Sequence, residues 1–177
     1  TTTHYSVDGG LNWPIYYSSI YVGGEGTHPI LYYSSDPAGN NETAQSVTVK
    51  IDSVRPTNPS RPADPHCAAQ DGAWQPTCSD PNFTWSGAGD ATSGVAGYYV
   101  YWGTDPAGTN STYVTSAGYD PSAVGNGTYY LRVQTRDVAG NTSTTWATLF
   151  ELKYDGTPPA NTSVTINGGA TRTNNSN

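Results

Sequence analysis

The sequence contains no methionine and only two phenylalanines, and only 12% of its 177 residues are charged. Lysine and arginine together number seven, against 14 acidic residues, which gives a net charge of −7. Because no basic stripe exists to neutralise phosphates, nucleic acid is excluded as a partner. No apolar run approaches the ~20 residues of a membrane span, so we expect no membrane span in this segment.

Motifs that carry known chemistry are missing as well. The sequence has no G-x-S-x-G elbow, no H-E-x-x-H pair and no Gly-rich phosphate loop. The three histidines, His4, His28 and His66, stand in different segments, and the acidic residues stand almost entirely in turns. We therefore expect that the protein is not an enzyme and has no cofactor, apart from the calcium considered below.

Turn formers and aromatic residues dominate what is present. The chain has 20 glycines, 13 prolines, 14 tyrosines and five tryptophans. β-Branched and aromatic residues alternate with turn formers, which predicts an all-β fold. The aromatic content argues against a disordered chain. Hydrophobic residues make up only 34%, but sandwiches of roughly 100 residues can close around a few aromatic anchors.

An internal repeat organises the chain. Residues 26–40 and 127–141 both fit G-T-x-x-[IL]-x-x-x-[ST]-x-D-x-A-G-N, at a constant offset of 101 residues. In the second copy Tyr129, Leu131 and Val133 alternate with polar residues, which indicates a half-buried antiparallel strand. The D-x-A-G-N that follows predicts a turn in which Asp and Asn cap backbone groups.

Each turn is followed by a return strand and then by a linker. The return strands are expected at 44–51 and 143–154. Asp52-Ser-Val-Arg-Pro56 and Asp155-Gly-Thr-Pro-Pro159 then repeat a D-x-x-x-P pattern. Proline at this point stops the sheet and stiffens the junction.

The repeat resembles a known class of domains. A hairpin followed by D-x-x-x-P is similar to bacterial Ig-like and fibronectin type III-like tandem repeats of large secreted or cell-surface proteins. Residues 3–10 with Trp13 resemble the Y-S-V-D-G-G-x-W strand of one repeat type, and residues 93–102 resemble the central strand of the fibronectin-like type. The resemblance implies tandem Ig-like or fibronectin III-like antiparallel β-sandwiches, with one complete domain flanked by partial ones.

The expected organisation has four parts. Residues 1–52 are the C-terminal part of a sandwich, 53–70 a Pro-rich linker or a loop leading into the next domain, and 71–155 a complete sandwich. Residues 156–177 are a linker and the first strand of a following domain, or a donor strand. Two interpretations follow: a window on a longer array, or head-to-tail assembly in which 160–177 completes the first domain of another chain.

Cys67 and Cys78 lie close together in a loop rich in Asp, Pro and Gly. We expect a local disulfide in an oxidising compartment, which would stabilise the fold by about 2–3 kcal/mol. A metal pair with His66 is the alternative.

Calcium is a candidate metal, because oxygen ligands gather near the hairpins and linkers. Plain turn capping is the alternative interpretation of the same residues. The candidate ligands are Asp36, Asn40, Asp52, Asp137, Asn141 and Asp155.

Sugars enter the predictions in two ways. N-x-[ST] sequons mark glycosylation candidates: Asn41, Asn82, Asn110, Asn126, Asn141, Asn161 and Asn174. Exposed aromatic rings could also stack on a bound glycan, although tryptophans are equally natural as core anchors. The candidate rings are Trp13, Trp74, Tyr98, Tyr130 and Trp146.

The resulting prediction is a non-catalytic extracellular structural or adhesive module at a cell surface. Such modules build a stalk, layer or filament, with neighbouring copies or domains of the same protein as partners. Head-to-tail strand complementation is one way in which they would assemble. The alternative function is a carbohydrate-binding accessory region of a secreted multidomain enzyme, with surface glycans as partners.

Overall fold

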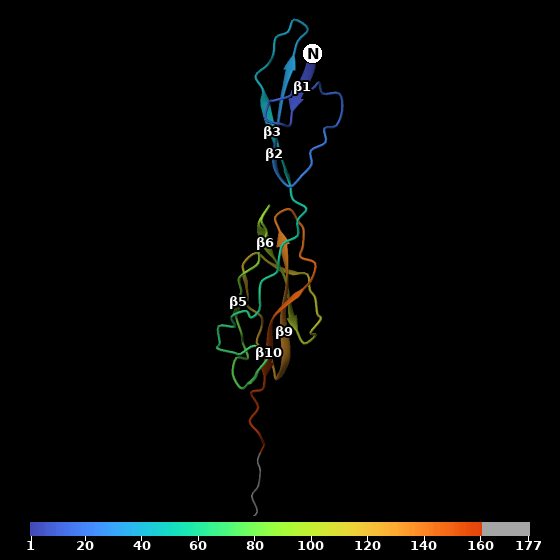
Figure 1. Ribbon diagram of the computed structural model, residues 1–177. Helices are drawn as coiled ribbons and strands as arrows, with labels where there is room; N and C mark the ends of the chain where they lie inside the picture. Colours follow the sequence, from blue (N-terminus) through green and yellow to red (C-terminus); the bar gives the residue numbers. More distant parts are fainter. Residues whose placement is uncertain (161–177) are drawn as a thin grey trace, which may run out of the picture.

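The computed structural model describes residues 1–160 and shows an elongated molecule made of two units in line (Figure 1). We call residues 2–51 the first unit and residues 57–155 the second unit. Every regular element in the described part is a β-strand, so this part is all-β, as predicted. No helix in it has the length and hydrophobicity needed to cross a membrane.

The first unit is one antiparallel sheet in the order β1-β2-β3. Its strands are β1 (Thr2–Ser6), β2 (Gly26–Ser35) and β3 (Gln45–Ile51). The β2–β3 hairpin lies at the position predicted from the repeat, and its turn forms the end of the molecule farthest from the second unit (Figure 1).

The second unit is a two-layered sandwich. A five-stranded sheet in the order β4-β10-β9-β6-β7 is accompanied by the two-stranded sheet β5-β8. The strands are β4 (Trp74–Gln75), β5 (Phe83–Thr84), β6 (Val95–Gly103), β7 (Thr112–Val114), β8 (Gly118–Tyr119), β9 (Gly127–Asp137) and β10 (Ala147–Tyr154). The long strands β6, β9 and β10 form its centre.

One strand pair departs from the expected antiparallel arrangement. β4 pairs with β10 in parallel, with Trp74 opposite Lys153. Parallel neighbours need a long connection, and β4 and β10 are separated by nearly the whole second unit. The chain therefore first runs along the unit over residues 57–73 and then adds β4 in the same direction as β10.

The core lies between the two sheets of the second unit. Leu131 and Val133 of β9 are fully buried, which confirms the period-two pattern in this strand. Phe83 of the smaller sheet packs against Phe150 of β10, with ring centroids 5.3 Å apart. Trp85 is also buried in this cluster.

The segment expected as a linker or leading loop lies along the second unit. Pro56 and Pro59 are buried, and the Ala63 amide donates a hydrogen bond to the Leu149 carbonyl (2.9 Å). Farther along, Cys67 and Cys78 form the predicted disulfide. Residues 57–65 thus form part of the sandwich, because backbone hydrogen bonds join them to β5 and β10.

Replacing Leu131 with Ala should lower the free energy of unfolding of the second unit by about 2–5 kcal/mol, because the side chain is fully buried between the sheets. Chemical denaturation followed by tryptophan fluorescence measures this change. Val138→Ala is the matched control: it removes an apolar side chain that is 66% exposed and should change the unfolding free energy little. Equal losses in the two variants would contradict this core.

Candidate functional site

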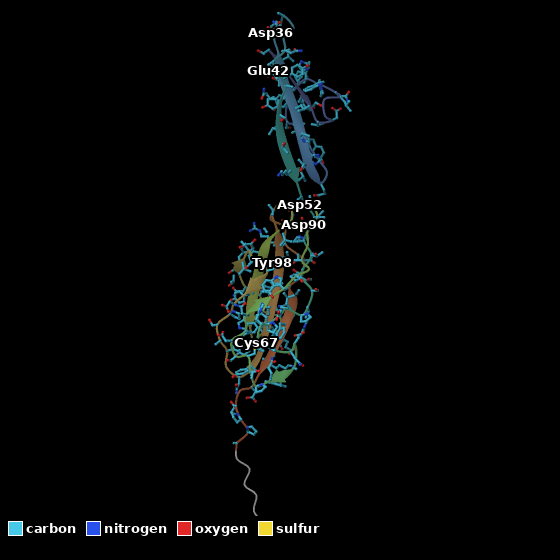
Figure 2. The ribbon with its side chains drawn as sticks, turned by 90° about the vertical axis from the view of Figure 1, so that its left-hand side faces the viewer. Asp36, Glu42, Asp52, Cys67, Asp90 and Tyr98 are labelled. Carbon is cyan, nitrogen blue, oxygen red and sulfur yellow. A yellow bond between two sulfur atoms is a disulfide. The ribbon has the colours of Figure 1, made fainter. Side chains whose placement is uncertain are left out.

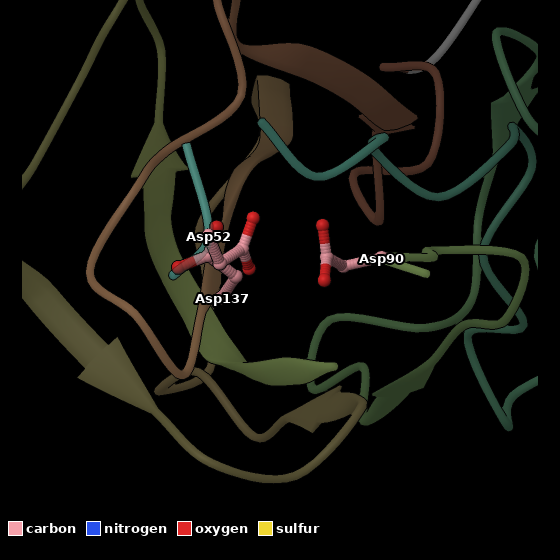
Figure 3. A group of neighbouring side chains, drawn as sticks. All are labelled: Asp52, Asp90 and Asp137. Carbon is pink, nitrogen blue, oxygen red and sulfur yellow. The ribbon is translucent and has the colours of Figure 1, made fainter. Parts of the chain in front are cut away.

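Three carboxylates meet where the two units join (Figure 3). Asp52 follows β3, Asp90 precedes β6, and Asp137 is the last residue of β9. One carboxylate oxygen from each lies within 4.8 Å of the others. We call these three residues the junction cluster.

Strand pairing explains why the cluster forms. β6 and β9 are antiparallel, with Val95 opposite Asp137, so the loop before β6 and the turn after β9 lie at the same end of the sheet. This end faces the first unit, from which the linker emerges at Asp52 (Figure 2). Two loops of one unit and the linker from the other therefore converge.

One oxygen of Asp90 caps its own loop. Its Oδ1 accepts hydrogen bonds from the backbone amides of Thr92, Ser93 and Gly94, at 2.9–3.1 Å. These bonds, with the Gly94 amide first among them, lower the pKa of Asp90 below its usual value and keep the carboxylate charged at neutral pH. Asp137 caps the β9–β10 turn in the same way, with Oδ1 accepting from the amides of Gly140 and Asn141.

Two oxygens of the junction cluster have no partner. The Oδ2 atoms of Asp52 and Asp90 are buried and accept no hydrogen bond within residues 1–160. The other oxygen of Asp52 is used, because it accepts a hydrogen bond from the Val54 amide (3.0 Å). A buried charged oxygen without a partner is costly, and native proteins nearly always satisfy it.

None of the three carboxylates takes part in an ion pair within residues 1–160. The ion pairs formed within this part of the chain involve Arg61 and Lys153. Glu25 adds a further negative charge nearby, close enough to Asp90 for their charges to interact. The Ser53 hydroxyl, which donates a hydrogen bond to Glu25, lowers the pKa of Glu25, so this group is charged too.

The arrangement matches what a hard divalent cation needs. Calcium takes oxygen ligands at about 2.4 Å, so two ligands on opposite sides of the ion stand roughly 4.8 Å apart. The junction cluster offers three carboxylate oxygens within that span. Calcium also accepts backbone carbonyls and water, which would complete the six to eight ligands it prefers.

The six predicted calcium ligands lie at three places. Asp52, Asp137 and Asn141 meet at the junction, where the Asn141 amide donates to Asp137 Oδ2. Asp36 and Asn40 form an equivalent turn in the first repeat copy, at the far tip of the first unit and away from the junction (Figure 2). Asp155 lies at the opposite end of the second unit and caps Thr157.

Turn capping is present in both copies of the repeat. Asp36 accepts from the amides of Ala38 and Asn40 and from the Asn40 side chain, and the Asn40 side chain contributes most to lowering the pKa of Asp36. Capping alone therefore explains Asp36 and Asn40. It leaves the free oxygens at the junction unexplained.

Asp90 is the cluster residue that the sequence reasoning missed. A signal was available, since Asp90 stands four residues before Gly94 at the start of the central strand, as a capping residue would. Placing it beside Asp137 additionally required the knowledge that β6 and β9 are neighbours.

The five candidate stacking rings do not form a row. Trp74 is exposed on β4, Trp13 packs against Tyr33 in the first unit, and Tyr130 and Trp146 are half-buried. Tyr98 must be corrected: only 6% of it is exposed, and it packs edge-on against Trp85 in the core. Burial also raises the pKa of Tyr98, and its ring is not available for a glycan.

The sequons fall into three groups. Asn41, Asn82, Asn110 and Asn126 are exposed. Asn141 is half-buried and holds the junction, while Asn161 and Asn174 lie outside the described residues. Glycosylation of the exposed group stays a prediction, and in this group the Asn126 side-chain nitrogen already donates hydrogen bonds to Asp155 and Thr157.

Comparison with known proteins gives likenesses among solved structures. No family model matches the sequence, and no curated protein matches it. Among solved structures, the chain is similar to the fibronectin(III)-like modules of Clostridium thermocellum CbhA, with 14% identity and a TM-score of 0.38. The match covers 86% of this chain and 77% of that chain.

Asp52→Asn should weaken calcium binding at the junction by about tenfold or more, because it removes a free charged oxygen and keeps the oxygen that caps Val54. Titration calorimetry with calcium chloride measures the effect. Asp36→Asn is the matched control, because Asp36 occupies the position in the first-unit turn that Asp137 occupies in the second-unit turn, but it lies away from the cluster. Equal affinities of wild type and Asp52→Asn would refute the site.

Proposed function

We propose that the chain is a non-catalytic, extracellular structural module that holds its two units in line as part of a cell-surface stalk, layer or filament. The observation that carries the proposal is the linker, which is hydrogen-bonded to both units instead of running free between them. A spacer needs such a linker, because a free linker would let the units swing.

The first unit holds the start of the linker. Glu25, just before β2, accepts a hydrogen bond from the Ser53 amide (2.9 Å) and another from the Ser53 hydroxyl. Ser53 directly follows Asp52 of the junction cluster, so the chain leaves the first unit in a fixed direction.

The second unit holds the rest of the linker. The side-chain amide of Asn141 donates hydrogen bonds to the backbone carbonyls of Asp52 (3.1 Å) and Val54 (3.4 Å). Arg55 donates to the Thr142 carbonyl (2.9 Å), and Thr57 pairs with Gly89. These bonds, together with the buried Pro56, fix the linker to the β9–β10 turn and to the loop before β6.

Asn58 anchors the end of this path inside the sandwich. Its Oδ1 accepts hydrogen bonds from the Thr135 amide, the Thr135 hydroxyl and the Ser143 hydroxyl. Its side-chain amide donates to the Thr145 carbonyl. All of its side-chain polar atoms are thus bonded to the β9–β10 hairpin.

Calcium has a structural part in this proposal. The junction cluster combines Asp52 of the linker with Asp90 and Asp137 of the second unit, so a bound cation would tie the linker to the sandwich and remove the repulsion among the three carboxylates. Sites with few charged ligands bind calcium weakly, with Kd on the order of 10⁻⁴–10⁻³ M, which is the range of extracellular modules. The disulfide favours the same compartment.

Joint stiffness tests the proposed role directly. With calcium at saturation, ¹⁵N relaxation should give one anisotropic rotational diffusion tensor for both units, as expected for a single elongated body. Asn141→Ala should loosen the joint, because it removes the amide that binds the Asp52 and Val54 carbonyls. The variant should then tumble as two bodies, and small-angle scattering should show a wider spread of shapes.

The control for this experiment is Asn40→Ala, which removes the equivalent side-chain amide from the turn at the outer end of the first unit. It should leave the joint unchanged. Independent tumbling of the two units in the calcium-loaded wild type would refute the spacer role.

A further inference from the structure

One sheet face of the first unit has the character of a core face but no second layer over it within residues 1–160. Residues paired across an antiparallel sheet share a face, and Tyr5 pairs with Tyr32 while Ile30 pairs with Val47. These four side chains line an apolar groove of about 290 Å³ with Tyr16 and others. We call this surface the open face.

The repeat identifies the open face with the core face of the second unit. Ile30 and Tyr32 correspond to Leu131 and Val133 at the 101-residue offset. Leu131 and Val133 are 0% exposed because the second layer covers them, whereas Ile30 is 9%, Tyr32 39% and Val47 51% exposed. The same strand surface is therefore closed in the second unit, whereas in the first unit only its centre at Ile30 is buried and Tyr32 and Val47 stay exposed.

In the second unit, part of the cover is the segment that follows the D-x-x-x-P linker. Residues 57–65 place Ala63 in the core, and its amide donates to the Leu149 carbonyl at the edge of β10. In the first unit the equivalent strand, β3, pairs only with β2 among the described residues. Its outer edge presents unused backbone groups, which is a template for another strand.

The chain carries a second linker of this kind, and its local structure repeats the first. Asp155 Oδ1 accepts from the Thr157 amide as Asp52 Oδ1 accepts from Val54, both at 3.0 Å. Asn126 accepts from the Gly156 amide (3.0 Å), as Glu25 accepts from Ser53. The exit of the second unit is thus built like the exit that already leads into a sandwich.

We infer that residues 160–177 of one copy cover the open face of a second copy, as residues 57–74 cover the second unit. The turn Asp36–Asn40 then receives the linker 155–159, as the turn Asp137–Asn141 receives residues 52–56. The contact is head-to-tail and uses a different surface on each of the two copies, so repeated contacts build a filament and do not close a pair.

The register of the added strand follows from the two repeats. Val47 pairs with Ile30, and Phe150 pairs with Leu131, which is the repeat equivalent of Ile30. Val47 therefore corresponds to Phe150, which makes the offset between β3 and β10 103 residues. Pro56 and Pro159 are separated by the same 103 residues. Ala63 is the seventh residue after Pro56, and Ile166 is the seventh after Pro159. Ile166 therefore takes the position of Ala63, and its amide faces the Ser46 carbonyl on the β3 edge.

The sequence of the tail suits this position. Val164 and Ile166 alternate with Thr165 and Asn167, which is the period-two pattern of a strand with one apolar side. An apolar side is what the groove between Tyr5, Ile30 and Val47 accepts.

Assembly state tests the inference. Sedimentation equilibrium of the chain at up to millimolar concentration should give species of at least twice the 18.7 kDa of one chain. Val47→Asp, on the open face, and Ile166→Asp, in the tail, should each give monomers. Thr48→Asp is the matched control, because Thr48 is exposed on the opposite face of the same strand, and this variant should still assemble.

Mixing the two blocked variants gives the decisive result. Val47→Asp retains a tail and Ile166→Asp retains an open face, so together they should form a 1:1 complex and nothing larger. A chain ending at residue 160 should also be monomeric, and it leaves every described residue unchanged. A wild type that stays monomeric at millimolar concentration would overturn the inference. So would self-association of Ile166→Asp, which would mean that two open faces meet.

The inference extends the proposed structural role but is measured separately. Mass reports the head-to-tail contact, while relaxation reports the joint inside one chain. A stiff monomer would overturn only the assembly, and a filament with a loose joint would overturn only the spacer.

Discussion

The side-chain amide of Asn141 donates hydrogen bonds in two directions at once. Within its own turn it binds the carboxylate of Asp137, and across the junction it binds the carbonyls of Asp52 and Val54. The turn that closes the β9–β10 hairpin is therefore also the surface that receives the linker. This double use of one amide ties the path of the chain between the units to the turn and brings Asp52 beside Asp137.

The sequence predicted well those features that depend on neighbouring residues. Alternation along β9 placed Leu131 and Val133 in the core, and the D-x-A-G-N pattern placed the hairpin turns, because strand periodicity and turn capping are local effects. The disulfide was also predictable, since Cys67 and Cys78 are close in sequence.

Features that depend on pairing between distant segments were less accessible. Asp90 joins Asp137 only because β6 and β9 are neighbours, a fact that no local pattern contains. The burial of Tyr98 follows from its sharing a strand face with Val100, but adjacent tyrosines at 98 and 99 left the choice of face open until the pairing was known. Asp36 and Asp137 are separated for a related reason: the two turns are alike, and within the described residues only the turn of Asp137 has a linker against it.

The parallel pairing of β4 with β10 has a mechanical consequence. The strands of both units run along the axis of the molecule (Figure 1). Tension applied at the two ends of the second unit pulls the segment that contains Ala63 and β4 one way and β10 the other, along the direction in which they lie side by side. The load then acts on the Ala63–Leu149 contact in shear, and the disulfide Cys67–Cys78 closes the loop that contains β4, so this loop cannot extend.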